Sequence, residues 1–408
     1  MDDEPTSITR QQPELLAYAQ VPFEGTRNGR TQDPNNYFKA AEWSPDGTCI
    51  IANCADNHIR NFVVPPDLLE QRDETLKLEV YCSIPSFESV NTFACYPGFN
   101  LQDPSTTLVL SAASEHPLRL NSMMTGQLVA SYPLVSATTE AYLKPHSLLF
   151  TADGNQLIAG SENLISRFDI SRPGEGPISS MKTGPKNARS SWSNPGTSLR
   201  GFVSALHIDP QYNVLAAGTL TRQVGLYDAA GEGECVGVFG LSGTEANDLV
   251  SGNGVTQVRW SRCGRYLYVA ERHSDGALVY DIRKTGQLLS WLIQRKARTN
   301  QRMHIELSCR NEDNESVWAG GTDGKMRCWA APHLREGEVA PDQEMQVHED
   351  SANSTSMHRS AYVLATAAGE RDFDDLGNAV HTPNKKLSVQ RNLLKLWQLS
   401  FTARSAYG

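Results

Sequence analysis

Residues 319–329 (AGGTDGKMRCW) contain a Gly-Lys pair of the kind that binds nucleotide phosphates in other proteins. A phosphate-binding loop needs the pattern G-x-x-x-x-G-K-[ST] between a strand and a helix, because its amides surround the phosphates and its hydroxyl binds magnesium. Here Ala319 stands where the first glycine is required, and Lys325 is followed by Met326, which has no hydroxyl. The segment therefore lacks both the spacing and the metal ligand that this chemistry needs.

The other candidates for catalytic chemistry are equally incomplete. Residues 231–237 (GEGECVG) have the wrong glycine spacing for a dinucleotide-binding loop, and the sequence contains neither G-x-S-x-G nor H-E-x-x-H. His146 and His207 lie in or just before apolar strand-like runs, which favours structural histidines over catalytic bases. We therefore expect a protein that is not an enzyme and uses no cofactor.

The eight cysteines are scattered singly, without any C-x-x-C pair. Zinc sites and the disulfide frameworks of small secreted domains show paired or regularly spaced cysteines. Most of the cysteines here lie inside apolar strand-like runs. We interpret them as reduced core residues and predict no metal site.

The composition is that of an ordinary soluble globular protein, with 408 residues, 39% hydrophobic and 20% charged, and a formal net charge of -9. A membrane-spanning helix requires roughly 18 to 20 consecutive apolar residues, and the sequence holds no such run. The first residues, MDDEPTSITR, lack the basic and apolar parts of a secretory signal. We expect an intracellular protein without membrane contact.

The feature that organises the chain is an internal repeat. Each copy has an apolar run with an aromatic or aliphatic anchor, a Gly or Asp turn, a strand of small residues such as IIANCAD, and a further strand such as HIRNFVV. The seven copies begin near Ala41, Asn91, His146, Ser204, Thr256, His304 and Ser354. Successive anchors are 47 to 58 residues apart, somewhat above the roughly 40 to 45 of a WD repeat, and they are Trp43, Phe93, Phe150, Ile208, Trp260 and Leu307.

Short alternating strands separated by Gly and Asp, with no helical period, indicate four-stranded sheets arranged radially. One such sheet cannot bury both of its faces, so neighbouring blades must cover it and the ring must close. We predict an all-β, seven-bladed WD-repeat β-propeller over residues 14–401, closed by an N-terminal strand at residues 15–21 (LLAYAQV). Residues 1–13 are expected to form a disordered N-terminal tail, and residues 402–408 a C-terminal tail.

When the repeats are aligned, residues 322–325 (TDGK) occupy the turn that reads ADNH at residues 55–58 and SDGA at residues 274–277. Tight hairpin turns select residues that tolerate positive φ, which costs an ordinary residue roughly 1 to 2 kcal/mol. The Gly-Lys pair is therefore predicted to lie in a hairpin turn and not in a phosphate-binding loop. The residues expected to be structural are Trp43 in the first blade and the turn residues Asp56, Asp275, Asp323 and Gly324.

The first blade, residues 37–68 (YFKAAEWSPDGTCIIANCADNHIRNFVVPPDL), and three shorter segments are more specific than a WD dipeptide. The shorter segments are residues 171–174 (SRPG), 299–302 (TNQR) and 364–367 (LATA). With these residues the chain resembles the telomerase Cajal body protein family, over about residues 37–399. The chain departs from the family in three ways: blade two is loosely patterned, most WD dipeptides are replaced by Phe-Asp, Tyr-Asp or Trp-Gln, and the long tails of animal members are absent.

Members of this family are WD-repeat proteins that bind small Cajal body RNAs and telomerase RNA, and short fungal members are linked to pre-mRNA splicing. The resemblance implies a non-enzymatic scaffold that binds small Cajal body, telomerase or spliceosomal RNAs and aids the localisation or assembly of their ribonucleoproteins. It further implies a nuclear protein, at Cajal body-like sites with some in the cytoplasm, whose partners are such an RNA and its ribonucleoprotein proteins. A monomer whose folding a chaperonin assists is expected.

Because the net charge is negative, an RNA-binding surface has to be local. Two windows contain no acidic residue, residues 176–208 and residues 282–305, and much of each falls in a connector between blades. These connectors of a propeller emerge on one face, which predicts a basic face on an acidic protein. Trp192, among Ser, Asn and Pro, is expected to stack on an unpaired base. The predicted RNA-binding residues are Arg295, Lys296, Arg298, Arg302, Lys182, Lys186, Arg189 and Trp192.

Two alternatives remain open on the sequence alone. The basic residues could form only a solvated rim, with Trp192 packed on the blades. The segment at residues 280–283 (YDIR) resembles the WD-x-R box of propellers that act as substrate receptors of cullin-type ubiquitin ligases, although Arg283 at the end of a strand commonly pairs with an acid of its own blade. The acidic stretch at residues 370–375 (ERDFDD) is interpreted as a solvated loop.

Overall fold

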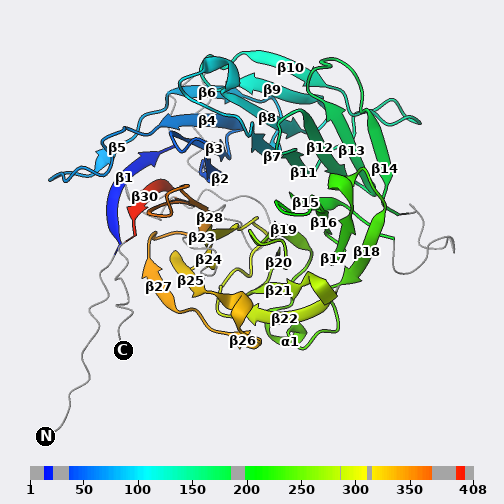
Figure 1. Ribbon diagram of the computed structural model, residues 1–408. Helices are drawn as coiled ribbons and strands as arrows, with labels where there is room; N and C mark the ends of the chain where they lie inside the picture. Colours follow the sequence, from blue (N-terminus) through cyan, green and yellow to red (C-terminus); the bar gives the residue numbers. More distant parts are fainter. Residues whose placement is uncertain are drawn as a thin grey trace, which may run out of the picture.

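The protein is a ring of seven β-sheets, here called blades, that stand side by side around a central axis (Figure 1). The computed structural model describes residues 13–21, 36–184, 198–284, 286–309, 315–369 and 392–399. Each blade runs from an inner strand at the axis to an outer strand at the rim. This arrangement confirms the predicted seven-bladed β-propeller.

Blades one to three follow the chain, with the inner strand first. Blade one consists of β2 (Phe38–Trp43), β3 (Cys49–Cys54), β4 (His58–Val63) and β6 (Cys82–Pro85). Blade two consists of β7 (Val90–Cys95), β8 (Leu108–Ala113), β9 (Leu118–Ser122) and β10 (Leu128–Tyr132). Blade three consists of β11 (Ser147–Phe150), β12 (Gln156–Ser161), β13 (Leu164–Asp169) and β14 (Ser179–Lys182).

Blades four to six repeat this order. Blade four consists of β15 (Val203–Ile208), β16 (Leu215–Thr219), β17 (Gln223–Tyr227) and β18 (Cys235–Gly240). Blade five consists of β19 (Val255–Trp260), β20 (Tyr266–Glu271), β21 (Ala277–Asp281) and β22 (Gln287–Leu292), with β26 (Gly337–Val339) added at its edge. Blade six consists of β23 (Ile305–Cys309), β24 (Glu315–Gly320), β25 (Lys325–Ala330) and β27 (Gln343–Gln346). The short helices in the loops are η1 (Pro104–Thr106), η2 (Ala229–Gly231), α1 (Asn247–Val250), η3 (Ile282–Lys284) and η4 (Pro332–Leu334).

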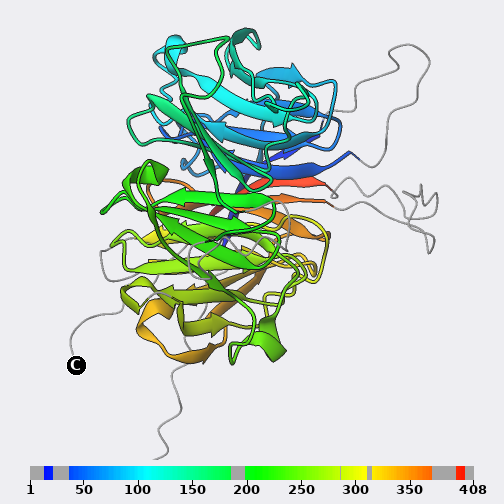
Figure 2. The same cartoon turned by 90° about the vertical axis from the view of Figure 1, so that its right-hand side faces the viewer.

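Blade seven joins the two ends of the chain. Its strands are β28 (Ala352–Met357), β29 (Val363–Ala368), β30 (Leu393–Gln398), the N-terminal β1 (Glu14–Gln20) and the short β5 (Leu76–Lys77). β1 runs antiparallel to β30, and the side view shows the two strands next to each other in blue and red (Figure 2). The N-terminal strand therefore closes the ring, as predicted. The predicted tails at residues 1–13 and 402–408 lie outside the described residues, apart from Pro13.

Small residues recur in the second strands of the blades because neighbouring blades cover these strands on both sides. All residues of β3 and β16 are buried. At the end of β16, a Cβ added to Gly218 would lie 2.4 Å from a methyl carbon of Val255, which belongs to the inner strand of the next blade. Close approach between blades thus explains the repeated pattern of small residues in the sequence.

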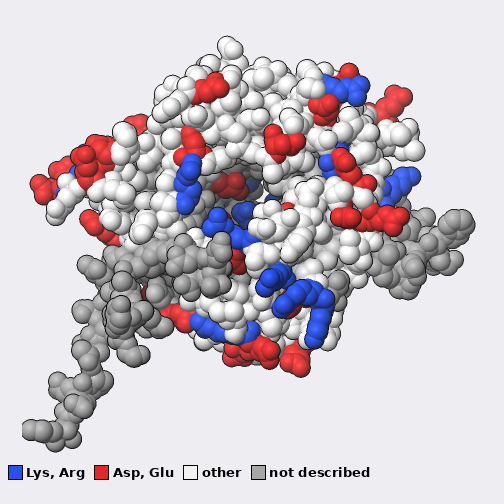
Figure 3. All heavy atoms as spheres, in the orientation of Figure 1, with Lys and Arg blue, Asp and Glu red and all other residues white. Residues whose placement is uncertain are grey.

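Strands that follow each other in a blade are antiparallel, so loops divide between the two faces of the ring. One face, here called the connector face, holds the connectors from each outer strand to the next inner strand and the turns between second and third strands. The opposite face holds the remaining turns. Figures 1 and 3 view the opposite face, and Figure 2 views the ring from its side.

Candidate functional site

The turn that contains the Gly-Lys pair joins β24 to β25 as an antiparallel hairpin. Gly324 has a φ of 70°, and the Lys325 side chain lies 3.2 Å from a carboxylate oxygen of Glu344. A phosphate-binding loop leads into a helix, whereas this one leads into a strand. The structure therefore confirms the predicted hairpin turn.

The predicted turn aspartates hold basic side chains in place. Asp323 accepts hydrogen bonds from both terminal nitrogens of Arg327, at 3.0 and 2.7 Å. Asp56 accepts from Arg60 in the same way, at 2.8 and 2.5 Å. Both arginine side chains are 1% exposed, so each carboxylate compensates a buried charge. Trp43 lies in the hydrophobic core between blades one and seven.

Arg295 lies inside the connector between blades five and six, residues 293–304, and not on its surface. It is buried, and its Nη2 donates a hydrogen bond to the carbonyl oxygen of Met303 at 2.7 Å. Gln294 and Lys296 both have positive φ, which reverses the chain on either side and turns Arg295 inward. Burial lowers the pKa of its guanidinium to about 10. This corrects the predicted surface position: the arginine stabilises the connector from within.

Lys296 and Arg298 reach the surface of the connector face, with 56% and 69% of their side chains exposed. Acids from neighbouring turns approach both: Lys296 Nζ lies 3.4 Å from Asp323, and Arg298 Nε lies 2.5 Å from Asp275. The acid-free window of the sequence therefore lies next to acidic side chains from other segments in the folded protein. Exposed pairs of this kind contribute about 0 to 1 kcal/mol, so a phosphate can displace them at low cost.

Arg302 reaches the central channel of the ring. Its Nη2 donates to the carbonyl oxygens of His146 at 3.2 Å and Ser204 at 3.0 Å, which belong to blades three and four. Burial and the neighbouring Arg272 lower the pKa of Arg302 to about 10. The predicted residue is therefore present at the axis of the ring, where it also braces two blades.

A cavity of about 270 Å³ lies at this end of the channel. Four basic residues from different parts of the chain converge on it, and they are here called the channel cluster: Lys39, Lys144, Arg272 and Arg302. Lys39 is the second residue of the inner strand of blade one, Lys144 comes from the connector between blades two and three, and Arg272 comes from a turn of blade five. The Nε of Arg272 is buried and has no hydrogen-bond partner within the described residues.

The two histidines that line the cavity have a lowered pKa, mainly because they are buried. Burial and the charges of Lys144, Arg302 and Arg272 lower the pKa of His146 to about 4. Burial and the same Arg302 lower the pKa of His304 to about 3. Both rings are therefore neutral near pH 7, so neither adds to the positive charge of the channel cluster.

Deeper in the channel the charges balance. Arg259 Nη2 lies 3.6 Å from a carboxylate oxygen of Glu306. Burial raises the pKa of Glu306 to about 7, and burial also raises the pKa of Glu42, which lines the cavity. The basic residues at the mouth of the channel would therefore attract an anion that enters from the connector face. Deeper in the channel the anion would meet the carboxyl groups of Glu42 and Glu306. This geometry favours binding at the mouth.

Of the second predicted group of residues, only Lys182 lies within the described part of the chain, and it is not at the channel. Lys182 is exposed at the end of β14, the outer strand of blade three, three strand spacings from the inner strand, or about 14 Å. Lys186, Arg189 and Trp192 lie outside the described residues. A role of these four residues in binding stays a prediction.

Three members of the channel cluster lie outside both acid-free windows of the sequence. Lys39, Lys144 and Arg272 each have an acidic residue within four positions in the sequence. A different signal would have found part of the site: Lys39 and His146 each stand four residues before the anchor of an inner strand. Equivalent positions of the inner strands face the central axis of the ring, so polar residues at these positions lie close together around it.

The opposite face carries the basic residues at the start of the second acid-free window. Arg283 and Lys284 precede β22, whereas Lys296 and Arg298 follow it, and this six-residue strand spans about 20 Å. Arg283 pairs with Asp281 of its own blade at 2.6 Å, as one of the open alternatives expected. Figure 3 shows basic side chains over blade five among acidic ones. The window therefore divides between both faces, and only its later part lies on the connector face.

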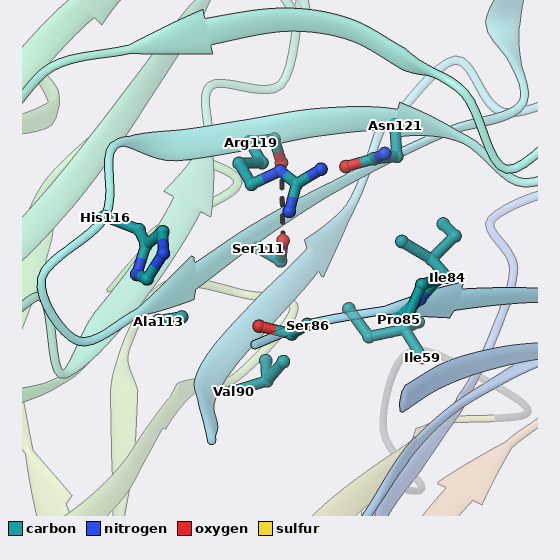
Figure 4. A pocket seen from close by; sticks show the side chains of 10 residues that line it. All are labelled: Ile59, Ile84, Pro85, Ser86, Val90, Ser111, Ala113, His116, Arg119 and Asn121. Atoms are coloured by element: carbon teal, nitrogen blue, oxygen red, sulfur yellow. Dashed lines mark hydrogen bonds between the residues drawn. The ribbon is translucent and has the colours of Figure 1, made fainter. Parts of the chain in front are cut away.

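A second hollow lies between blades one and two and is too small for a ligand (Figure 4). Its volume of about 10 Å³ is at the lower limit for a single water molecule. His116 and Arg119 border it from the hairpin of β8 and β9, and Ser86 borders it from the connector between blades one and two. It lies where blades one and two meet on the connector face.

The part of the chain that the structure describes offers neither a metal site nor a membrane-spanning helix. Within the described ranges, no group of three or more His, Cys, Asp or Glu side chains is placed to hold a metal ion. Of the eight cysteines, Cys49, Cys54 and Cys328 are buried and Cys263 is exposed. Among the described helices, none has the length and apolar character needed to cross a membrane.

No protein-family model matches the chain. Individual proteins do match it. The chain is 32% identical over 329 residues to the Schizosaccharomyces pombe protein named guanine nucleotide-binding protein negative regulator 1, an alignment that covers 79% of this chain and 78% of that protein. It is 27% identical over 364 residues to telomerase Cajal body protein 1 of Homo sapiens, which covers 88% of this chain. The chain belongs to the telomerase Cajal body protein family.

This membership confirms the resemblance drawn from the first blade and the shorter segments. Another relative in the family is Protein SWT21 of Vanderwaltozyma polyspora, 26% identical over 312 residues, or 74% of this chain and 68% of that protein. The match to the human family member covers 62% of its length. What the whole human protein does therefore carries over only as a proposal.

Proposed function

We propose that this member of the family is a non-enzymatic WD-repeat scaffold that binds a small non-coding RNA on its connector face. The observation that carries the proposal is the convergence of four basic residues at the mouth of the channel, in a protein whose net charge is -9. The name of the relatives, telomerase Cajal body protein, supports RNA of the telomerase or small Cajal body type. A spliceosomal RNA is a further candidate, because the sequence also resembles the short fungal members of the family that are linked to pre-mRNA splicing.

The geometry suits the phosphate backbone better than base edges. Lys and Arg neutralise phosphates regardless of sequence, and such contacts position a nucleic acid without reading it. Lys296 and Arg298 lie on the connector that leads to Arg302, so a strand bound at the channel mouth can continue over that connector. Sequence would then be read elsewhere along the RNA or by partner proteins.

The biological setting follows from the same proposal. We place the protein in the nucleus, at Cajal body-like sites and with some in the cytoplasm, where it aids the localisation or assembly of ribonucleoproteins or pre-mRNA splicing. Its partners are the RNA and the proteins of that ribonucleoprotein. The protein itself acts as a monomer and folds with the help of a chaperonin.

The decisive test is the salt dependence of RNA binding. RNA is recovered by crosslinking in cells and sequenced, and its affinity for the purified full chain is measured over a range of salt. Each phosphate contact contributes about -0.7 to the slope of log affinity against log salt on single-stranded RNA. If both residues contact phosphate, the double variant Lys144→Ala/Arg272→Ala should flatten the slope by about 1.4.

The matched control removes two charges from the opposite face, with Arg265→Ala/Lys284→Ala, both of which are exposed. This control should keep the slope of the wild-type protein. Equal slopes for all three proteins, or no RNA recovered by crosslinking, would contradict the proposed function.

A second candidate is a scaffold for proteins. The fission yeast relative is named as a negative regulator of a guanine nucleotide-binding protein, and that name makes no reference to RNA. Exposed apolar side chains on the opposite face support this candidate: Leu334, Tyr212 and Tyr362 are 70%, 64% and 55% exposed. Co-purification of a guanine nucleotide-binding protein that survives nuclease treatment would favour it. Co-purification of a ubiquitin-ligase linker protein, lost in Arg283→Ala, would instead favour the ligase-receptor hypothesis.

A further inference from the structure

The connector between blades one and two presents an aromatic ring to solvent. Phe87 is 89% exposed, more than any other large hydrophobic residue in the described ranges. Its ring lies nearly parallel to that of His116, with centroids 6.4 Å apart and 13° between the planes. This separation falls within the range of offset-stacked aromatic pairs. The ring of Phe87 from the connector and the ring of His116 from blade two therefore stack on each other, and we call this aromatic pair, whose Phe87 ring is exposed, the shelf.

The shelf is held in position from both sides. The backbone amide of Ser86 donates to the carbonyl oxygen of Asn57 at 2.8 Å. Ser89 accepts a hydrogen bond from Lys39 Nζ at 2.9 Å, and Lys39 also donates to the carbonyl oxygen of Val90 at 2.9 Å. Phe87 therefore lies between two residues that hydrogen bonds hold in place. Binding of a ligand to Phe87 should then cost little conformational entropy of this segment.

The shelf adjoins the channel cluster. Val90 borders both the central cavity and the small hollow of Figure 4, on whose other side lies His116. Ser89, which lines the cavity, follows Phe87 by two residues, so their Cα atoms are at most about 7 Å apart. Lys39 contacts Ser89 and belongs to the channel cluster. An aromatic surface and a phosphate-binding charge therefore lie within the span of one nucleotide.

We propose that Phe87 and His116 bind the base of one unpaired RNA nucleotide by stacking, while its phosphate contacts Lys39 at the channel mouth. Proteins that bind single-stranded nucleic acid combine a positive groove with aromatic side chains, because every base has a stacking face. In a duplex these faces are already stacked on neighbouring bases, so the shelf selects a loop, bulge or single-stranded end. The inference rests on the proposed function and specifies the form of RNA that is bound.

The test compares a short single-stranded oligouridine RNA with a perfectly paired hairpin RNA and with free uridine monophosphate. Phe87→Ala should weaken binding of the oligouridine about 5- to 150-fold, without a change in its salt slope, because no phosphate contact is lost. Phe87→Leu should behave like Phe87→Ala, since it keeps apolar area but not the ring. Phe87→Trp should keep the affinity, and its added fluorescence should be quenched by the oligouridine.

Tyr212→Ala is the matched control, because it removes an exposed aromatic ring from the opposite face. It should leave oligouridine binding unchanged, and the paired hairpin should bind Phe87→Ala and wild type alike. If Phe87→Ala binds oligouridine as wild type does while Lys144→Ala/Arg272→Ala binds less, the shelf is refuted and the RNA-binding face stands. If neither variant changes binding, the proposed function fails and the shelf fails with it. Binding of uridine monophosphate as tight as that of the oligouridine would identify a free nucleotide as the ligand and overturn the assignment to RNA.

Discussion

Gly324 illustrates how one residue links two blades. A Cβ added to it would lie 2.1 Å from the carbonyl oxygen of His348, in the connector to blade seven. The amide of His348 in turn donates to the carbonyl oxygen of Gly324 at 3.0 Å. Glycine is therefore required here twice, once for its positive φ and once for the close approach of the next connector. The adjacent Lys325 has no comparable contact, since its ammonium group pairs with Glu344 at the surface.

We predict that Gly324→Val lowers the free energy of unfolding by more than the roughly 1 to 2 kcal/mol that left-handed backbone alone costs, because the side chain also overlaps the His348 carbonyl. Lys325→Ala should change it by less than about 1 kcal/mol, as expected for an exposed ion pair. Urea unfolding of both variants and wild type measures these differences. A Gly324→Val variant as stable as wild type would contradict the prediction.

Residue types alone could not place the basic side chains. The conformation that buries Arg295 depends on positive φ at Gln294 and Lys296, and neither is a glycine, so the sequence carries no signal for it. Arg272 joins the channel cluster only because a turn of blade five faces the axis. By contrast, Arg302 was identified from sequence because its connector leads directly into an inner strand.

At the scale of elements, the regular spacing of the repeat copies in the sequence predicts the blades. The second strand of a blade is covered on both sides, so its residues are mostly apolar and often small, and this pattern recurs in the sequence. The edge strands β5 and β26 were not predicted. They are two and three residues long and pair in parallel with β1 and β22. Segments this short show no alternation of apolar and polar residues from which a strand could be predicted. Only the finished ring brings these short segments to an open edge.

The closing strand is an element whose loss should affect the whole ring. β1 pairs with β30 along its full length and buries Ala17 and Ala19. Deleting residues 1–24 should therefore remove several hydrogen bonds, each contributing about 0.5 to 1.5 kcal/mol, together with the apolar contacts between blades. We expect a clearly lower melting temperature by circular dichroism, whereas deletion of residues 1–12 should leave it unchanged. Equal melting temperatures for the full chain and the longer deletion would show that β1 does not close the ring.

For the whole molecule, the distribution of charge matters more than its sum. A net charge of -9 argues against general affinity for polyanions, and the opposite face mixes both signs (Figure 3). Within the described residues, Lys and Arg from four segments converge around a cavity at the connector-face end of the axis. The ring is what creates this convergence, since each blade contributes the start of its inner strand to a common centre. Binding there should be abolished by any change that opens the ring.

The same ring should also make the protein sensitive to acid. Burial is the largest cause that lowers the pKa of four histidines, to about 4 for His146 and to about 3 for His207, His304 and His348. Below their ordinary pKa of about 6.5 the unfolded chain binds protons that the folded protein excludes, so their stabilisation is present above pH 6.5 and is lost as pH falls. Glu306 acts in the opposite sense, since its raised pKa makes the folded state gain stability as pH falls from about 7. Glu42, whose pKa burial also raises, acts in the same sense as Glu306. Four histidines outweigh these two carboxyl groups, so we expect a net loss.

His348 allows the histidine contribution to be measured separately. It is buried, its Nε2 lies 2.7 Å from the Thr366 hydroxyl, and Trp397 donates to the same hydroxyl at 2.9 Å. His348→Gln keeps a polar group there but removes the titration, so the variant should be less stable than wild type near neutral pH. Because wild type alone must protonate this site on unfolding, the difference should shrink by about 2 kcal/mol between about pH 6.5 and pH 4.5. Urea unfolding across this range measures both curves, and parallel curves would mean that the buried imidazole does not carry the acid sensitivity of the ring.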